Sequence, residues 1–168
     1  MQESFDSRFF RNACGQFLTG VAIVTTTGEN GKPVGITANS FTSVSLGPPL
    51  ILVSLDKKLG SYSAFMNSEG YAVHVLAEEQ QELSGHFAKR GVDKFQELDY
   101  KEGLYHVPLI SNALAVFECR VDQKVDAGDH TLLLGRVERV QINDPTRRPL
   151  GYLRGRYTVP EQEKELTK

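Results

Sequence analysis

Short runs of β-branched and apolar residues, each closed by turn-forming residues, recur along most of this chain of 168 residues. The run at 21–27 is followed by four residues rich in glycine at 28–31, the length of a common hairpin connection. A second run then begins near Pro33. This arrangement is typical of an antiparallel strand pair.

The same pattern continues along the chain. The return strand from Pro33 is expected to run through Ile36 and Ala38 and to stop at 47–49. Further strands are predicted at 50–55, 70–76, 114–125 and 131–142, the last two forming a long hairpin around 126–129, and helices at 61–66 and 78–89. Strands joined by short turns, with helices set between them, predict a mainly β protein with flanking helices, built as an antiparallel barrel.

A helix is also expected at the start of the chain. Phe5, Phe9, Ala13 and Phe17 recur every four residues, and Gly20 supplies a stop signal. This spacing predicts an aromatic face turned toward the core.

Length, composition and charge limit the class of protein. A chain of this length fits one domain over 1–168, with a core at about 5–160 and a polar tail at 161–168. Nineteen basic and 21 acidic residues give a net charge of −2, without a basic block for nucleic acid or a membrane surface. The acidic N-terminus and the lack of a long apolar run favour a cytoplasmic protein without a membrane span.

The only two cysteines, Cys14 and Cys119, lie far apart and form no CxxC motif. We expect both to be buried, reduced and unconnected with a metal site.

The stretch from Gly35 to Ser45 breaks the alternation expected of a strand. Its apolar positions 36 and 38 give way to 41 and then to 44, so the register slips twice. Such slips indicate a β-bulge or a strand that leaves its sheet and exposes backbone polar groups. Six polar side chains accompany them: Thr37, Asn39, Ser40, Thr42, Ser43 and Ser45. The pattern fits either a site for a planar ligand with many acceptors or a solvated strand face.

Two other clusters could carry chemistry. Gly128-Asp129-His130 places an imidazole at the start of a strand, where it could exchange a proton or simply make a structural hydrogen bond. His86, Lys89 and Arg90 end a predicted helix, where they could face an anion or complement the helix dipole. Lys57 and Lys58, which follow a predicted strand, carry the same ambiguity. There is no GxGxxG or Walker-type motif to indicate a Rossmann nucleotide site.

Read together, these motifs resemble the flavin reductase family that supplies two-component monooxygenases. The resemblance covers roughly residues 5–160. It is carried by Gly20-Val21-Ala22-Ile23-Val24-Thr25-Thr26, Thr37-Ala38-Asn39-Ser40-Phe41-Thr42-Ser43-Val44-Ser45, Pro48-Pro49-Leu50, Phe87-Ala88 and Gly128-Asp129-His130.

The resemblance implies a split β-barrel that binds FMN or FAD at a homodimer interface. It implies flavin contacts at Thr37, Ala38, Asn39, Ser40, Ser43, Val44, Ser45, Ser54, Leu55, Asp56, Lys57, Ser61, His86, Phe87, Ala88 and Arg90. It further implies that His130 is the catalytic residue and contacts the nicotinamide together with Tyr157.

The implied activity is reduction of flavin by NADH or NADPH, followed by diffusion of free reduced flavin to a separate oxygenase. No motif selects between FMN and FAD, between NADH and NADPH, or between a tightly bound flavin and one used as a substrate. No motif identifies the oxygenase. Two alternatives stay open: an oxidase of the pyridoxamine-phosphate type, against which Gly128-Asp129-His130 argues, and a flavin-binding protein without catalytic activity.

Overall fold

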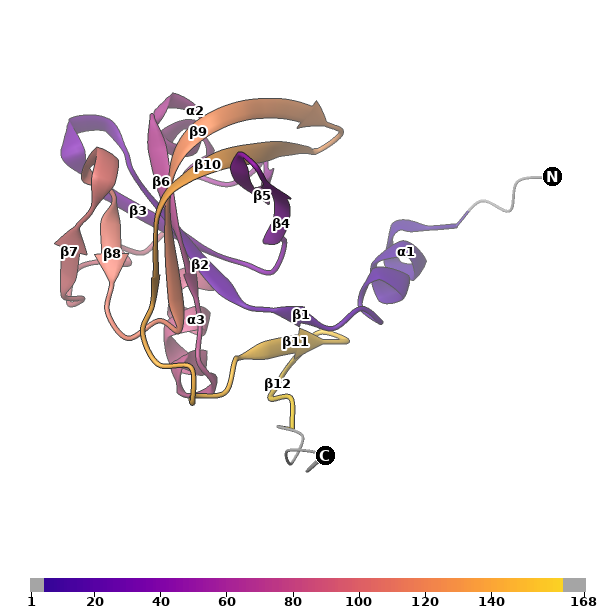
Figure 1. Ribbon diagram of the computed structural model, residues 1–168. Coiled ribbons are helices and arrows are strands. Elements are labelled where there is room, and N and C mark those ends of the chain that lie inside the picture. Colours follow the sequence, from indigo (N-terminus) through magenta and orange to yellow (C-terminus); the bar gives the residue numbers. More distant parts are fainter. Residues whose placement is uncertain (1–4, 162–168) are drawn as a thin grey trace.

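A computed structural model describes residues 5–161 of the chain (Figure 1). Its helices are α1 (Ser7–Cys14), α2 (Tyr62–Asn67) and α3 (Gln81–Ala88), with 3-10 turns η1 (Glu29–Gly31), η2 (Glu78–Gln80) and η3 (Leu104–His106). Its strands are β1 (Thr19–Gly20), β2 (Ala22–Thr27), β3 (Pro33–Ala38), β4 (Thr42–Leu46), β5 (Pro49–Asp56), β6 (Gly70–Val75), β7 (Tyr100–Glu102), β8 (Pro108–Ile110), β9 (Ala115–Ala127), β10 (His130–Ile142), β11 (Gly151–Leu153) and β12 (Arg156–Thr158). Apart from Glu161, the predicted polar tail at 161–168 lies outside the described residues.

Seven strands form the main sheet, in the order β3-β2-β6-β9-β10-β5-β4, and each neighbouring pair is antiparallel. The hairpins β2–β3 and β9–β10 were both predicted from the sequence and are confirmed. The long β9–β10 hairpin arches over the top of the molecule in Figure 1. The mainly β, antiparallel prediction is therefore confirmed.

The central strands β2 and β6 are covered on both faces. Successive residues of a strand point to opposite faces, and Val24 accordingly packs in one apolar cluster with Val73 and Phe65. Its neighbour Ile23 packs in a second cluster with Phe87 of α3. The first cluster fills the barrel, and the second joins the barrel wall to α3 and the C-terminal strands.

His74 of β6 is fully buried between these layers. Its Nδ1 lies 3.1 Å from the carbonyl oxygen of Ile23, and its Nε2 accepts a hydrogen bond of 3.1 Å from the amide of Ile110. These two contacts fix a neutral imidazole with its proton on Nδ1. Burial lowers the pKa of His74 to about 4, although the bond to Ile23 acts in the opposite direction.

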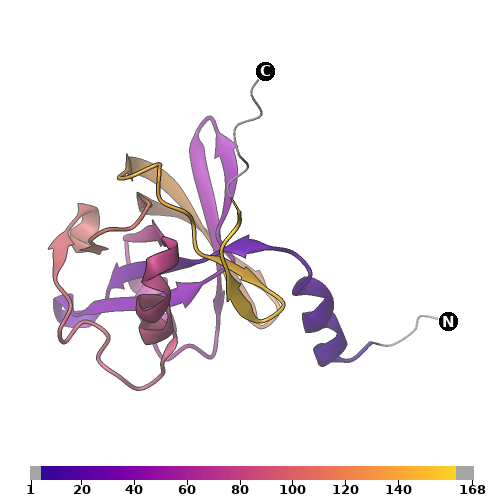
Figure 2. The same cartoon turned by 90° about the horizontal axis from the view of Figure 1, so that it is seen from below.

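The first helix departs from the sequence-based prediction. Asp6 caps α1 by accepting a 2.7 Å hydrogen bond from the amide of Phe9, and the helix ends at Cys14 rather than near Gly20. The predicted burial of its aromatic face is wrong, since Phe9 is 66% and Phe17 is 76% exposed. Figures 1 and 2 show the reason: α1 stands apart from the barrel, and no other helix or strand of residues 5–161 covers it.

The same placement makes the expected burial of Cys14 wrong, while Cys119 is buried as predicted, and both thiols are unpaired. Among the helices of residues 5–161, none has the length and apolar character needed to cross a membrane.

The break in alternation at 35–45 is real. The single strand expected from Pro33 to 47–49 is divided into β3 and β4, and residues 39–41 belong to neither. The register of β4 against β5 shifts between Ser43 and Ser45, which is the bulge that the slipped pattern indicated. The sequence pattern did not reveal the short strands β1, β7, β8, β11 and β12.

Lowering the pH should destabilise the protein through His74. Its pKa is about 4 in the folded protein against 6.5 ordinarily, so the unfolded chain binds the proton more readily, and stability falls as the pH drops through this range. Between pH 7 and pH 4 this loss should be about 3 kcal/mol. Urea denaturation at both values should therefore show a smaller loss in His74→Gln. Equal losses in the two proteins would contradict the assignment.

Candidate functional site

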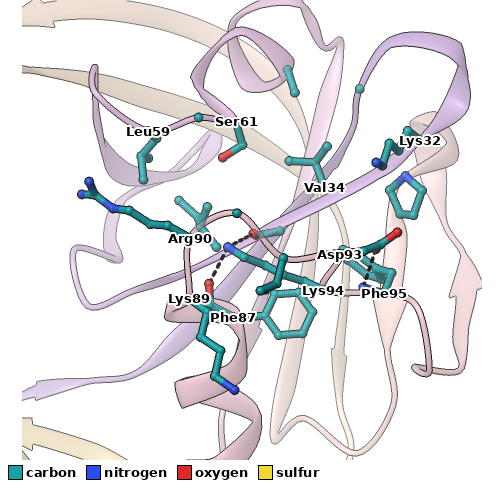
Figure 3. A pocket seen from close by; sticks show the side chains of 18 of the residues that line it. Lys32, Val34, Leu59, Ser61, Phe87, Lys89, Arg90, Asp93, Lys94 and Phe95 are labelled. Carbon is teal, nitrogen blue, oxygen red and sulfur yellow. Dashed lines mark hydrogen bonds between the residues drawn. The ribbon is translucent and has the colours of Figure 1, made fainter.

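A cleft of about 1070 Å³ lies along the outer side of β3 (Figure 3). One wall is β3 itself, from Pro33 to Thr37, and a second is the connection from β5 to α2, which contributes residues 59–61. The end of α3 and the loop after it, residues 87–95, form the remaining wall. The cleft therefore joins three segments that are far apart in sequence.

The floor of the cleft depends on Gly35 of β3. A Cβ at this position would lie 2.5 Å from Cε1 of Phe87 and 3.3 Å from Cε2 of Phe95. These two rings meet edge to face, with centroids 5.2 Å apart at 88°. Glycine thus permits the aromatic pair to pack directly on the strand backbone, where a side chain would force it away.

Lys94 ties the two walls together. Its ammonium donates to the carbonyl oxygen of Phe87 at 2.6 Å and to that of Gly35 at 3.0 Å. The Phe87 carbonyl belongs to the last turn of α3, where carbonyls lack helical partners and favour a cation. The backbone oxygen of Lys94 in turn receives a hydrogen bond of 3.0 Å from Nε2 of His86. Partial burial lowers the pKa of Lys94.

The cleft is suited to an anionic ligand. Four cationic side chains line it, Lys32, Lys89, Arg90 and Lys94, against two carboxylates, Glu29 and Asp93. Within residues 5–161, the Arg90 guanidinium and the Ser61 hydroxyl have no hydrogen-bond or ion-pair partner. Unpartnered donors in a positively charged cleft with an aromatic floor fit a flat ligand that carries phosphate.

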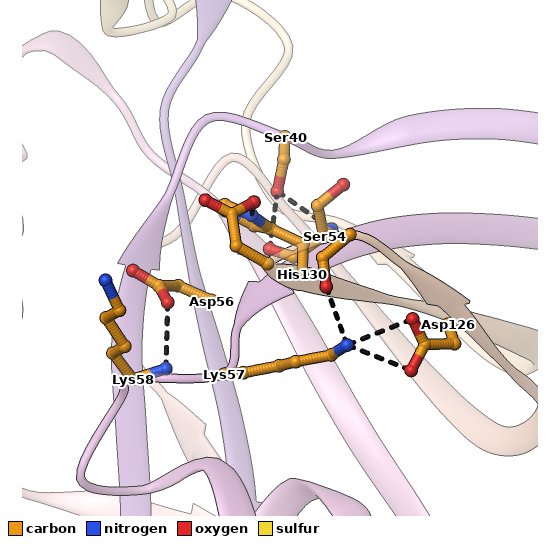
Figure 4. Close-up of polar contacts among 9 residues, drawn as sticks. Ser40, Ser54, Asp56, Lys57, Lys58, Asp126 and His130 are labelled. Carbon is orange, nitrogen blue, oxygen red and sulfur yellow. Dashed lines mark hydrogen bonds and ion pairs between the residues drawn. The ribbon is translucent and has the colours of Figure 1, made fainter. Parts of the chain in front are cut away.

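A second polar cluster lies at the ends of β5 and β10 (Figure 4). The hydroxyl of Ser40 accepts a bond of 3.0 Å from the Ser54 amide and donates one of 3.1 Å to the Ser54 carbonyl. These bonds fix the 39–41 segment against β5. The cluster adjoins the cleft along the chain, because Thr37 precedes Ser40 and Ser61 follows β5.

His130 opens β10 directly after the turn of the long hairpin, and its side chain is 40% exposed. Its Nδ1 lies 2.7 Å from Oδ1 of Asp129. The hydrogen bond from His130 lowers the pKa of Asp129, so the carboxylate is ionised and acts as the acceptor. The contact keeps a proton on Nδ1 and leaves Nε2 available to a ligand.

The structure brings the predicted site residues together in two groups. Thr37, Ser61, Phe87, Ala88 and Arg90 line the cleft. Ser40, Ser54, Asp56, Lys57 and His130 form the polar cluster, in which His130 is opposite Asp56 in the strand register.

The other predicted residues lie elsewhere. Leu55 is buried in the barrel core. Ala38 is the last residue of β3 and packs against the barrel core. Asn39 follows it, and Ser43, Val44 and Ser45 lie on β4; of these, Asn39, Ser43 and Val44 are exposed. His86 bonds to Lys94, and the Tyr157 hydroxyl lies 2.8 Å from that of the buried Ser84.

Ser84 also connects this contact to the cleft, because its carbonyl accepts a hydrogen bond of 2.6 Å from the hydroxyl of Thr37. Thr37 and Tyr157, both predicted as cofactor contacts, are thus held to the same turn of α3.

Sequence reasoning missed Gly35 as part of the cleft floor and Lys94 as the residue that bonds α3 to β3. Gly35 opens the slipped stretch, which is a usable signal. Lys94 lies in an irregular segment whose pattern gave no signal at all.

The fold and the cleft together define a β-barrel protein with a positively charged binding cleft on its outer wall. The chain belongs to the flavin reductase like family, whose domain model matches residues 14–160. The resemblance stated from the motifs and the split-barrel prediction are both confirmed.

Relatives with established names agree with this assignment. The chain is 44% identical over 153 residues to the "Flavin-dependent trigonelline monooxygenase, reductase component" of Acinetobacter baylyi, covering 91% of this chain and 49% of the relative. It is 46% identical over 139 residues to "FMN reductase (NADH) SmoA" of Agrobacterium fabrum, covering 83% of this chain and 79% of the relative. The chain thus spans about half the length of the first of these relatives.

Among solved structures, the NADH:FAD oxidoreductase SgcE6 of Streptomyces globisporus, in complex with NAD and FAD fragments, matches with a TM-score of 0.85. The two chains are 35% identical, and the match covers 99% of each.

Replacing Gly35 with alanine should destabilise the fold, since the added methyl group overlaps the Phe87 ring. We expect a loss of about 1 to 3 kcal/mol in the free energy of unfolding, measured by urea denaturation. Gly85→Ala is the matched control, because a Cβ in this interior position of α3 meets nothing within 4 Å. It should stabilise by about 0.5 to 1 kcal/mol. Wild-type stability in Gly35→Ala would show that the floor is not tightly packed.

Proposed function

We propose that this chain is an NAD(P)H:flavin oxidoreductase that reduces FMN or FAD and supplies reduced flavin to a separate monooxygenase. The observation that carries the proposal is the positively charged cleft with unpartnered donors at Ser61 and Arg90. His130 pairs with Asp56 at the end of β5, and the connection that follows β5 lines the cleft. The names of the relatives support it, since they include an FMN reductase, an NADH:FAD oxidoreductase and a monooxygenase reductase component. The family match at 14–160 supports a single domain over 1–168.

The residues of the cleft have separate roles in this proposal. Ser61 and Arg90 bind the flavin phosphate with donors that no other described group uses. Thr37 and the backbone of 39–41, which is outside both flanking strands, contact the polar edge of the ring system. Backbone amides there are suited to a site where negative charge develops.

Hydride transfer from a nicotinamide to a flavin is chemistry that the two bound cofactors supply, and the protein contributes orientation. His130 serves the nicotinamide side. Asp129 holds its ring through Nδ1, so that Nε2 faces outward as an acceptor. Tyr157, anchored to Ser84, is the second nicotinamide contact in this proposal.

We further propose that reduced flavin leaves the cleft and diffuses to the oxygenase. Three of the four cations that line the cleft, Lys32, Lys89 and Arg90, are exposed to solvent. Solvent and salt weaken the attraction of such exposed charges for an anion, which favours exchange of the ligand. We assign the activity to the cytoplasm, where unpaired thiols such as those of Cys14 and Cys119 stay reduced.

A homodimer completes the proposal. Phe9 and Phe10 of α1, and Phe17 shortly after it, are each more than half exposed in the single chain. Leu46, at the tip of the β4–β5 hairpin, is 97% exposed. Exposed apolar groups of this size on separate projecting elements mark an interaction surface, and a second copy of the chain is its simplest occupant.

The activity is tested by following nicotinamide absorbance after mixing the protein with flavin and NADH or NADPH. We expect turnover only when flavin is present. His130→Ala should raise the nicotinamide KM about three- to tenfold, the cost of one lost hydrogen bond, and leave flavin affinity unchanged. Absence of turnover with every combination of FMN or FAD with NADH or NADPH would contradict the activity. Loss of flavin binding in His130→Ala would contradict the role of that residue.

The dimer is tested by light scattering. The wild-type protein should have twice the chain mass of 18.7 kDa. Phe9→Glu, which places a charge on the apolar face of α1, should shift the protein toward the monomer. Ser7→Glu adds the same charge on the side of the same exposed helix turned away from Phe9 and is the control. A monomeric wild-type protein, or an unaffected Phe9→Glu dimer, would argue against this surface.

A further inference from the structure

The ammonium of Lys57 is fully engaged by the turn of the long hairpin. Its Nζ lies 2.9 and 3.0 Å from the two carboxylate oxygens of Asp126 and 2.7 Å from the carbonyl oxygen of Gly128. A lysine has three N–H donors, and these three acceptors match them. Figure 4 shows the side chain extending from the end of β5 to this turn.

The backbone of Lys57 holds the same turn at a second point. Its amide donates a hydrogen bond of 3.0 Å to the carbonyl oxygen of Asp129. The preceding residue, Asp56, pairs with His130 in the register of β5 and β10. The end of β5 therefore fixes the turn on both sides of Asp129, the residue that orients the His130 ring.

The turn depends on such contacts because little else packs on it. Gly128 has a φ of +67°, and the side chains of Asp126 and Asp129 are 80% and 81% exposed. An exposed turn without apolar contacts is free to move unless polar bonds restrain it. His130 follows directly, so any movement of the turn displaces its ring.

We propose that Lys57 is a positioning residue for His130 and so controls nicotinamide binding rather than flavin binding. The inference rests on the proposed function and revises the role as a flavin contact that the family resemblance implied. Two observations carry it: the donors of Lys57 are occupied by the turn, and Lys57 does not line the cleft, where Ser61 and Arg90 offer unoccupied donors.

The test compares two affinities in Lys57→Met, which keeps the length of the side chain and removes its donors. The nicotinamide KM should rise about three- to tenfold. The flavin dissociation constant, measured by fluorescence quenching without nicotinamide, should stay within about twofold of wild type. Lys57→Arg, which keeps a charged donor, should have a nicotinamide KM between those of Lys57→Met and the wild-type protein. A large loss of flavin affinity in Lys57→Met would overturn the proposal.

Asp126→Asn distinguishes more sharply between Lys57 as a positioning residue for His130 and Lys57 as a flavin contact. If Lys57 positions the turn, this variant should also raise the nicotinamide KM, and the double variant should be no worse than Lys57→Met. Lys57 could instead be a phosphate-binding residue that Asp126 keeps away from the flavin. In that case Asp126→Asn would free the Lys57 ammonium and tighten flavin binding, which would overturn the proposal. Lys58→Met removes the same charge from the neighbouring residue, whose ammonium makes no hydrogen bond within residues 5–161 and acts on Asp129 only through its charge. It should leave both affinities within about twofold of wild type.

An NMR measurement keeps the inference independent of turnover. The ring signals of His130 should shift or broaden in Lys57→Met and stay unchanged in Lys58→Met, with or without catalytic activity. A wild-type protein without turnover would then contradict the proposed function, while the His130 signals would still test whether Lys57 positions that residue. Unchanged His130 signals in Lys57→Met would refute the positioning role.

Discussion

Burial of the central strands on both faces is the constraint on which the rest of the structure depends. Ile23 and Val24 are neighbours in β2, and each is fully buried in a different apolar cluster. A strand apolar on both faces requires a second layer outside the barrel. α3 and the segment up to Phe95 supply that layer, and the cleft lies where it meets β3. The site is thus a consequence of how the barrel wall is covered.

The two parts of the site are built with different rigidity. The cleft floor rests on strand backbone and an aromatic pair, and the Lys94 ammonium fixes the end of α3 to β3. His130 instead follows an exposed turn whose conformation depends on polar contacts. This division suits the proposed transfer of hydride between two cofactors, because one ligand must be held while the other approaches it in the correct orientation.

Sequence patterns succeeded where a local signal and the tertiary structure agree. The glycine-rich turn at 28–31 predicted the β2–β3 hairpin, and the slipped alternation predicted the irregularity between Ser43 and Ser45. They failed for α1, because a periodic aromatic face indicates burial without saying whether its own chain provides the cover. They also missed strands such as β11 and β12, whose three residues are too few to show a period.

By itself, the sequence determined the antiparallel strand order along the chain, the break after β3 and the candidate residues Thr37, Ser61, Arg90 and His130. The strand pattern, the break and the first choice of Thr37, Arg90 and His130 depend on turn chemistry, periodicity or a motif, which a chain carries before it folds, whereas Ser61 came from the family resemblance. Only the tertiary structure decided that Gly35, Phe87 and Lys94 form one floor and that the Lys57 ammonium belongs to the hairpin turn. The Lys94–Gly35 and Lys57–Gly128 contacts join residues 59 and 71 positions apart, and their geometry is set by the packing of whole elements.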